Sequence, residues 1–221
     1  MAGHSLDDVG VRILGSLIEK KFTTPDNYPL TLNAITAACN QTSNREPVMQ
    51  LDEAAVKRSL DELARRSLVR AVHRGDSRAL RYREEVSQNL HLHEPELAAL
   101  CVLLLRGPQT AGEIRTRAGR MFQFSEPRHV EITLESLMSL SPPLAALLPR
   151  RPGQKEARYT HLLSGEPQVG TTERAEARPS AAAQAPTASE RIETLETEVG
   201  ALRVEMAELR AQLEAFRRQF Q

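Results

Sequence analysis

One order of hydrophobic patterns occurs twice along residues 1–163, and this repeat limits the fold more than any other feature of the chain. In each half, three segments with helix-spaced apolar residues precede two short strand patterns separated by a turn. In the first half we expect a helix that Ser5 caps, two further helices at 30–39 and 52–67, and strands at 68–73 and 78–83. The second half is expected to have helices at 96–105, 110–118 and 127–140, with strands at 144–150 and 157–163.

Three helices followed by a β-hairpin are typical of a winged helix. The turn in the first hairpin contains Gly75 and Asp76, which supply the backbone freedom that a tight turn requires. We therefore predict a mainly α fold with small β-hairpins (α+β). It would comprise two tandem winged-helix domains, at 1–88 and 89–163, and a C-terminal coiled-coil helix.

Residues 164–189 are rich in Pro, Ala, Ser, Thr and Glu, and Val169 is their only large aliphatic residue. Such a segment cannot bury enough apolar surface to offset the entropy of ordering it. We predict a flexible linker over this range.

Residues 190–221 carry apolar side chains at alternating spacings of three and four, which is typical of a coiled coil. Parallel self-pairing would place Glu198 against Arg203 and Glu205 against Arg210, so the charges at the interface edge would be complementary. We therefore predict a homodimer; the alternative is a single amphipathic helix docked on the chain's own domain. The predicted dimer contacts are Ile192, Leu195, Val199, Leu202, Met206, Leu209, Leu213 and Phe216.

The chain has 29 basic and 29 acidic residues, but this balance is uneven along the sequence. Residues 57–83 contain nine basic residues and three acidic ones, an excess of six positive charges on the third helix and the hairpin. In a winged helix these elements meet the major groove and the DNA backbone. The candidate contacts with double-stranded DNA are Arg45, Lys57, Arg58, Arg65, Arg74, Arg78, Arg81 and Arg83.

Two alternatives to DNA contact stay open. Asp52 and Glu53 would repel phosphate if the first turn of the third helix faced DNA, and the hairpin arginines could instead be solvated or paired with acidic residues. A protein-interaction scaffold built from the winged helices and the coil is therefore the alternative function. The polar run 40–45 either reads base edges or closes a turn, and the turn is favoured. A sparser basic set, which includes Arg120 and Arg128, occurs in the second half.

No motif indicates catalysis or a cofactor. The chain lacks a phosphate-binding glycine loop, a CxxC pair and an HExxH sequence. His91, His93 and Glu94 are expected to be linker and helix-cap residues rather than metal ligands, and Cys39 and Cys101 to be buried thiols of a reduced protein. No apolar run reaches about 20 residues and no secretory signal is present, so we expect a cytoplasmic, non-enzymatic protein without a membrane span.

Three long strings closely resemble the bacterial YceH family. They are TTPDNYPLTLNAITAACNQTSNREPV (23–48), LLLRGPQTAGEIRTRAGRMFQF (103–124) and LPRRPGQKEARYTHLLSGE (148–166). The resemblance covers about residues 6–166 and implies two tandem winged-helix domains in a bacterial cytoplasmic protein. It leaves the activity open, since a fold does not by itself define a function.

Overall fold

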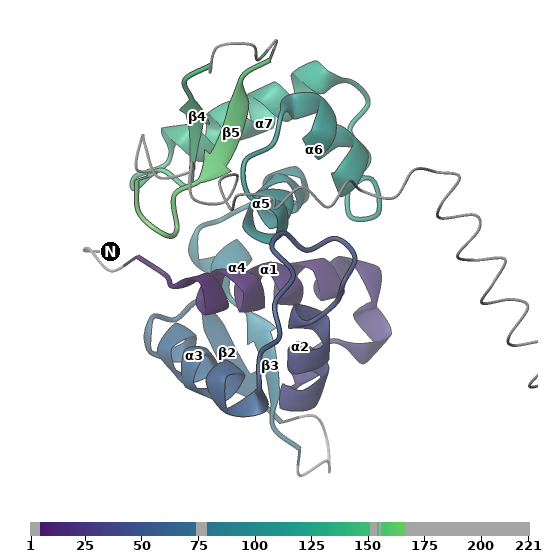
Figure 1. Ribbon diagram of the computed structural model, residues 1–221, viewed down its shortest axis with the longest axis vertical. Coiled ribbons are helices and arrows are strands. Elements are labelled where there is room, and N and C mark those ends of the chain that lie inside the picture. Colours follow the sequence, from purple (N-terminus) through teal and green to yellow (C-terminus); the bar gives the residue numbers. More distant parts are fainter. Residues whose placement is uncertain (1–4, 74–78, 151–153, 155, 167–221) are drawn as a thin grey trace, which may run out of the picture. The chain divides into compact units, whose positions relative to one another are not determined.

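The computed structural model describes residues 5–73, 79–150, 154 and 156–166. They form a mixed α/β fold of helices and small antiparallel sheets, as Figure 1 shows. The predicted linker and the predicted coil lie outside the described residues. None of the helices found in the described part of the chain combines the length and the apolar character needed to cross a bilayer.

The first half contains a bundle of helices and one three-stranded sheet. Its strands lie in the order β1-β3-β2, and β3 pairs antiparallel with both neighbours, with Tyr82 opposite Leu30 on one side and opposite Ala71 on the other. The elements in chain order are α1 (Asp8–Thr23), a 3-10 helix (Pro25–Asn27), β1 (Leu30–Thr31), α2 (Leu32–Cys39), α3 (Glu53–Arg65), β2 (Val69–Val72), β3 (Arg81–Glu84) and α4 (Val86–Asn89).

The second half repeats the order of three helices and a hairpin. The hairpin pairs Ala145 with His161 and Leu148 with Arg158. Its elements are α5 (Glu94–Arg106), α6 (Ala111–Ala118), α7 (Pro127–Ser139), β4 (Ala145–Leu148) and β5 (Arg158–His161).

The predicted helices and strands are confirmed except at two places: Leu30 and Thr31 form β1 instead of the start of the second helix, and the first helix begins later than predicted. Asp7, and not Ser5, caps α1, because its Oδ1 accepts a hydrogen bond from the amide of Gly10 at 2.8 Å. The chain before Asp7 is extended, and the Leu6 amide donates to the carbonyl of Leu163 at 2.7 Å. No local pattern in the sequence predicts this long-range pairing. The short helix α4 was also not predicted.

Helices α1 and α5 join the two halves through one hydrophobic core. Every residue from Leu97 to Leu105 is buried, and the leucines of α5 reach Gly15 of α1. Gly15 leaves room for this approach, since a side chain at its position would collide with Leu105. The division into domains at residue 88 stays a prediction, and the core residues of both halves belong to one contiguous cluster.

The two cysteines are free and buried, as predicted. The thiol of Cys101 donates to the carbonyl of Gly15 at 3.3 Å, and that of Cys39 lies 3.7 Å from the hydroxyl of Ser16. Burial raises the pKa of both thiols, so neither is poised to act as a thiolate nucleophile.

His161 on β5 makes the stability of the fold depend on pH. Burial lowers its pKa from 6.5 to about 4, an effect that the charge of Asp8 only partly opposes, and its Nδ1 has no hydrogen-bond partner among the described residues. Below pH 6.5 the unfolded chain binds a proton that the folded chain does not, so stability is complete above that pH and is lost as the pH falls toward 4. We expect the free energy of unfolding to fall by about 1 kcal/mol between about pH 7.5 and about pH 5.5.

Urea denaturation across this pH range measures the effect, with the His161→Gln variant as the comparison. The glutamine side chain stays neutral over this pH range. The free energy of unfolding of the variant should therefore fall by about 1 kcal/mol less than that of the wild-type protein. Identical pH profiles for the two proteins would contradict the assignment to His161.

Candidate nucleic-acid interface

Helix α3 presents a charged face away from the core. Val56, Leu60 and Leu63 are buried as predicted, because their spacing places them on one side of the helix. Arg58 is exposed on the other side and has no ion-pair partner among the described residues. It is the α3 cation most readily available to a ligand.

The other two candidate cations of α3 form ion pairs within the helix. Lys57 Nζ lies 2.6 Å from Asp61 Oδ1, and Arg65 Nη2 lies 2.5 Å from Glu62 Oε2. The Arg65 side chain is 72% exposed, and Lys57 and Asp61 are also largely open to solvent. Exposed pairs of this spacing contribute little to stability, so a phosphate can replace the carboxylate at little cost.

The acidic first turn of α3 is held by local hydrogen bonds. Asp52 caps the helix by accepting from the amide of Ala55 at 2.6 Å, and Glu53 accepts from the side-chain amide of Asn33 at 3.3 Å. Both carboxylates therefore have a structural partner at this end, and the exposed cations lie further along the helix.

The hairpin arginines surround one buried carboxylate. Arg83 Nε lies 2.7 Å from Glu85 Oε1 and Arg70 Nε lies 3.2 Å from the same oxygen, although only 4% of the Glu85 side chain is exposed. Arg70 was missed as a candidate. The predicted hairpin could have identified Arg70, because antiparallel pairing places it opposite Arg83.

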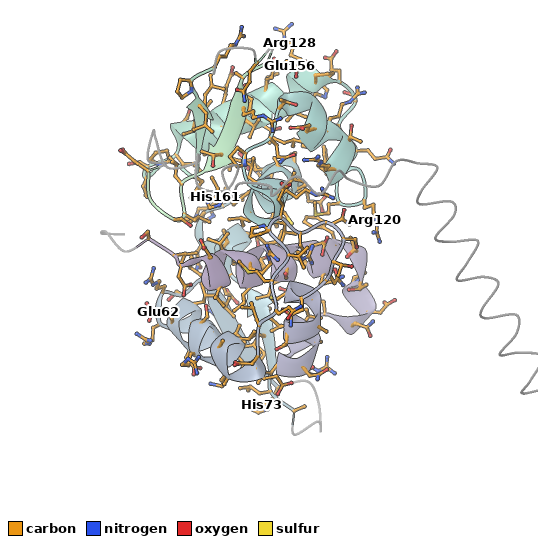
Figure 2. All side chains as sticks on the ribbon, viewed as in Figure 1. Glu62, His73, Arg120, Arg128, Glu156 and His161 are labelled. Carbon is orange, nitrogen blue, oxygen red and sulfur yellow. The ribbon has the colours of Figure 1, made fainter. Side chains whose placement is uncertain are left out.

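The remaining hairpin candidates divide into two groups. Arg81 Nη1 donates to the carbonyl of Pro29 at 2.8 Å, so this side chain ties β3 to the segment before β1. Arg74 and Arg78 lie outside the described residues. Figure 2 labels His73, the last described residue before them, at the tip of the first half.

Arg45 is a structural residue, which corrects its place among the candidate DNA contacts. Its side chain is fully enclosed, and its Nη2 lies 2.6 Å from Glu19 Oε2. Its Nε donates to the carbonyl of Ala38 at 3.0 Å, close to the end of α2. A guanidinium held in this way cannot reach a nucleic acid without breaking the fold around it.

The polar run after α2 is a turn, the interpretation that was favoured. The side chain of Asn40 accepts from the amide of Leu51 and donates to its carbonyl, both at 2.8 Å. Asn44 has a φ of 59°, a left-handed conformation that Asn adopts more readily than most residues. Figure 1 shows the segment between α2 and α3 crossing α1 to reach α5, where the Glu46 amide donates to the Leu105 carbonyl.

Of the junction residues, His93 and Glu94 belong to the start of α5, and His91 precedes it. His93 is its N-cap, and its backbone amide donates to Glu96 Oε2 at 2.8 Å. Within the part of the chain that the structure describes, no group of three or more His, Cys, Asp or Glu side chains could hold a metal ion.

The chain is similar to proteins from several bacteria. Residues 6–154 match the profile of a family described as "Protein of unknown function, DUF480". Proteins named UPF0502 are 53% identical over 165 residues in Geotalea uraniireducens (75% of each chain) and 51% identical over 180 residues in Geobacter sulfurreducens (81% of each chain). A third, from Chromobacterium violaceum, is 49% identical over 176 residues, or 80% of each chain.

Proposed function

The chain belongs to the DUF480 family, and we propose that it is a non-enzymatic, DNA-binding regulatory protein of the bacterial cytoplasm that acts through winged helices. The observation that carries this proposal is the order of elements in the first half. A helix, a short strand, two further helices and a hairpin follow one another, and the first strand joins the hairpin as a third strand. In this arrangement α3 is the helix that enters the major groove.

The charge on α3 favours contact through its middle and its C-terminal part. Arg58 is exposed, and the partners of Lys57 and Arg65 are carboxylates that solvent already screens. The two carboxylates of the acidic end accept hydrogen bonds from Ala55 and Asn33, so contact through that end is disfavoured. Arg74 and Arg78 of the hairpin would add backbone contacts that position the helix.

Binding to a fluorescently labelled mixed-sequence duplex tests this function. If about five phosphates are contacted, the slope of the logarithm of the affinity against the logarithm of the salt concentration should be about −4.5 between about 50 and 200 mM salt. We expect the double substitution Lys57→Ala with Arg58→Ala to weaken binding about tenfold. It should also reduce the magnitude of the slope by about 2.

Arg128→Ala is the matched control for this experiment. Arg128 lies on α7 in the second half, is exposed, and has no ion-pair partner among the described residues. It should leave both the affinity and the slope unchanged. A wild-type protein that does not bind at low salt, or a double variant with the wild-type slope, would refute the proposal.

The proposed protein is a homodimer held by the predicted coil at 190–221. Removing these residues is expected to reduce the molar mass measured by light scattering to about half, because the truncated chain would lack the predicted dimer contacts. Pairing would also raise the effective concentration of the second winged helix on DNA, so the truncated chain should bind more weakly. A monomeric full chain would contradict the prediction.

A second candidate function is the protein-interaction scaffold, which the surface of the second half favours. Ile132 on α7 and Leu147 on β4 are large apolar side chains that are 54% and 51% exposed. Burial and the nearby charges of Glu131 and Glu135 raise the pKa of Tyr159, which lies opposite Leu147 in the hairpin. Exposed apolar side chains with acidic residues near them suit a protein partner better than DNA, so absent salt-dependent DNA binding would favour this function.

A further inference from the structure

A hollow of about 560 Å³ lies beside the C-terminal end of α1 and has only polar residues in its lining. Its walls come from α1, from the loop after α2 and from the turn after α6, so both halves contribute to it. This size lies in the range of sites for small ligands, and the lining favours a ligand that is itself polar. The residues that could bind such a ligand are Lys20, Thr23, Thr42, Ser43, Asn44 and Arg120.

The lining has more positive than negative charge. Glu19 is its one acidic residue, and the carboxylate of Glu19 is already paired with the enclosed guanidinium of Arg45 at 2.6 Å. Lys20 Nζ lies 3.7 Å from the same carboxylate, and Arg120 has no ion-pair partner among the described residues. Arg45 and Lys20 thus already pair with the one carboxylate of the lining, and Arg120 adds a further positive charge, which favours an anion and disfavours a metal cation.

A further cation borders the hollow. Arg106 Nη2 donates to the side-chain oxygen of Asn44, which lies in the lining. Burial lowers the pKa of Arg106, and the positive charges of Arg117 and Arg45 lower it further, whereas the negative charges of Glu46 and Glu19 raise it. Arg106 therefore adds a cation at this edge, and a bound anion would interact favourably with it.

The hollow also offers neutral hydrogen-bond donors. Thr42 and Ser43 are exposed, and their hydroxyls make no hydrogen bond to other described residues. A phosphate monoester has three acceptor oxygens and close to two negative charges, which suits cations combined with hydroxyl donors better than a carboxylate does. Arg120 can bind two of these oxygens at once, and Lys20 acts as a point charge.

We propose that this hollow binds a small molecule that carries a phosphate monoester, with Lys20 and Arg120 on its phosphate. Figure 2 places Arg120 close to where the second half meets α1, whereas Arg128 lies at the far end of the second half. A ligand held by Lys20 and Arg120 would bridge the two halves and stabilise their contact. The site is separate from the α3 cations proposed to bind DNA.

Titration of the full chain with inorganic phosphate and with glycerol 3-phosphate, followed by backbone amide NMR at constant ionic strength, tests the proposal. We expect saturable shifts at Thr42, Ser43, Asn44 and Arg120. Arg120→Gln alone, and together with Lys20→Gln, should weaken binding at least tenfold. Arg128→Gln should have the wild-type affinity, and unchanged melting temperatures would show that the variants are folded.

Three results would overturn the proposal. The first is a lack of saturation with either probe, and the second is equal binding by the Arg120→Gln and Arg128→Gln variants. The third is that duplex DNA shifts the same amides and displaces phosphate, which would make the hollow part of the nucleic-acid interface. The Lys57→Ala, Arg58→Ala double variant should bind phosphate normally, so this test can fail while the proposed DNA contact stands.

Discussion

Replacing Arg45 by alanine is expected to lower the free energy of unfolding by about 3 kcal/mol, because the substitution leaves the largely buried Glu19 carboxylate with only Lys20, at 3.7 Å, as a counterion. The side chain of Arg45 is completely enclosed, and only 13% of the Glu19 side chain is exposed. The five N–H groups of the guanidinium all have acceptors within hydrogen-bond distance. These acceptors are the carbonyls of Ala38 and Asn44, the Glu19 carboxylate and the Gln41 side chain.

Urea denaturation of the full chain measures this loss, and two variants make it specific. Arg58→Ala removes an exposed arginine with no ion-pair partner among the described residues and should change stability by less than about 0.5 kcal/mol. Arg45→Lys keeps the charge but loses the planar fork that binds Glu19, so an intermediate loss is expected. Equal stability of the Arg45→Ala and Arg58→Ala variants would contradict the structural role.

The hydrophobic periodicity of the sequence was sufficient to predict most of the elements. Helix α3 is an example, because Val56, Leu60 and Leu63 fall on one face and are buried as the pattern requires. The start of α1 was missed because the chain before Asp7 pairs with Leu163, a contact that depends on the folded second half. Local patterns contain no information about such long-range pairing.

The candidate site was less predictable than the fold, because charge along a sequence does not reveal burial. Arg45 and Arg58 are the same type of residue in the sequence, yet Arg45 is enclosed and Arg58 is exposed. Arg12 is likewise buried in α1 and donates to the carbonyl of Cys39, so the end of α2 is closed by two arginines. The excess charge of the segment 57–83 is also smaller at the surface than in the sequence, since Glu85 forms ion pairs with both Arg70 and Arg83.

Changing Gly15 to alanine is the sharpest test of the contact between α1 and α5. A Cβ at this position would lie 2.8 Å from Cδ2 and 2.9 Å from Cγ of Leu105, and 3.1 Å from Cβ of Leu104. The helices would have to separate, at a cost that exceeds the gain in helix propensity, and we expect a net loss of about 2 kcal/mol. Gly112→Ala is the matched control, since its nearest neighbour would be Thr110 Oγ1 at 3.9 Å, and it should gain about 0.5 kcal/mol.

Cys101 reports locally on the same contact, because its thiol donates to the carbonyl of Gly15. In a Cys39→Ala background, separation of α1 and α5 should speed alkylation of Cys101 in the Gly15→Ala variant relative to the Gly112→Ala variant, under conditions where both are folded. Since both halves share the core that this pair of helices builds, loosening it should lower the stability of the two halves together. Unchanged stability with unchanged alkylation would show that α5 does not approach Gly15 this closely.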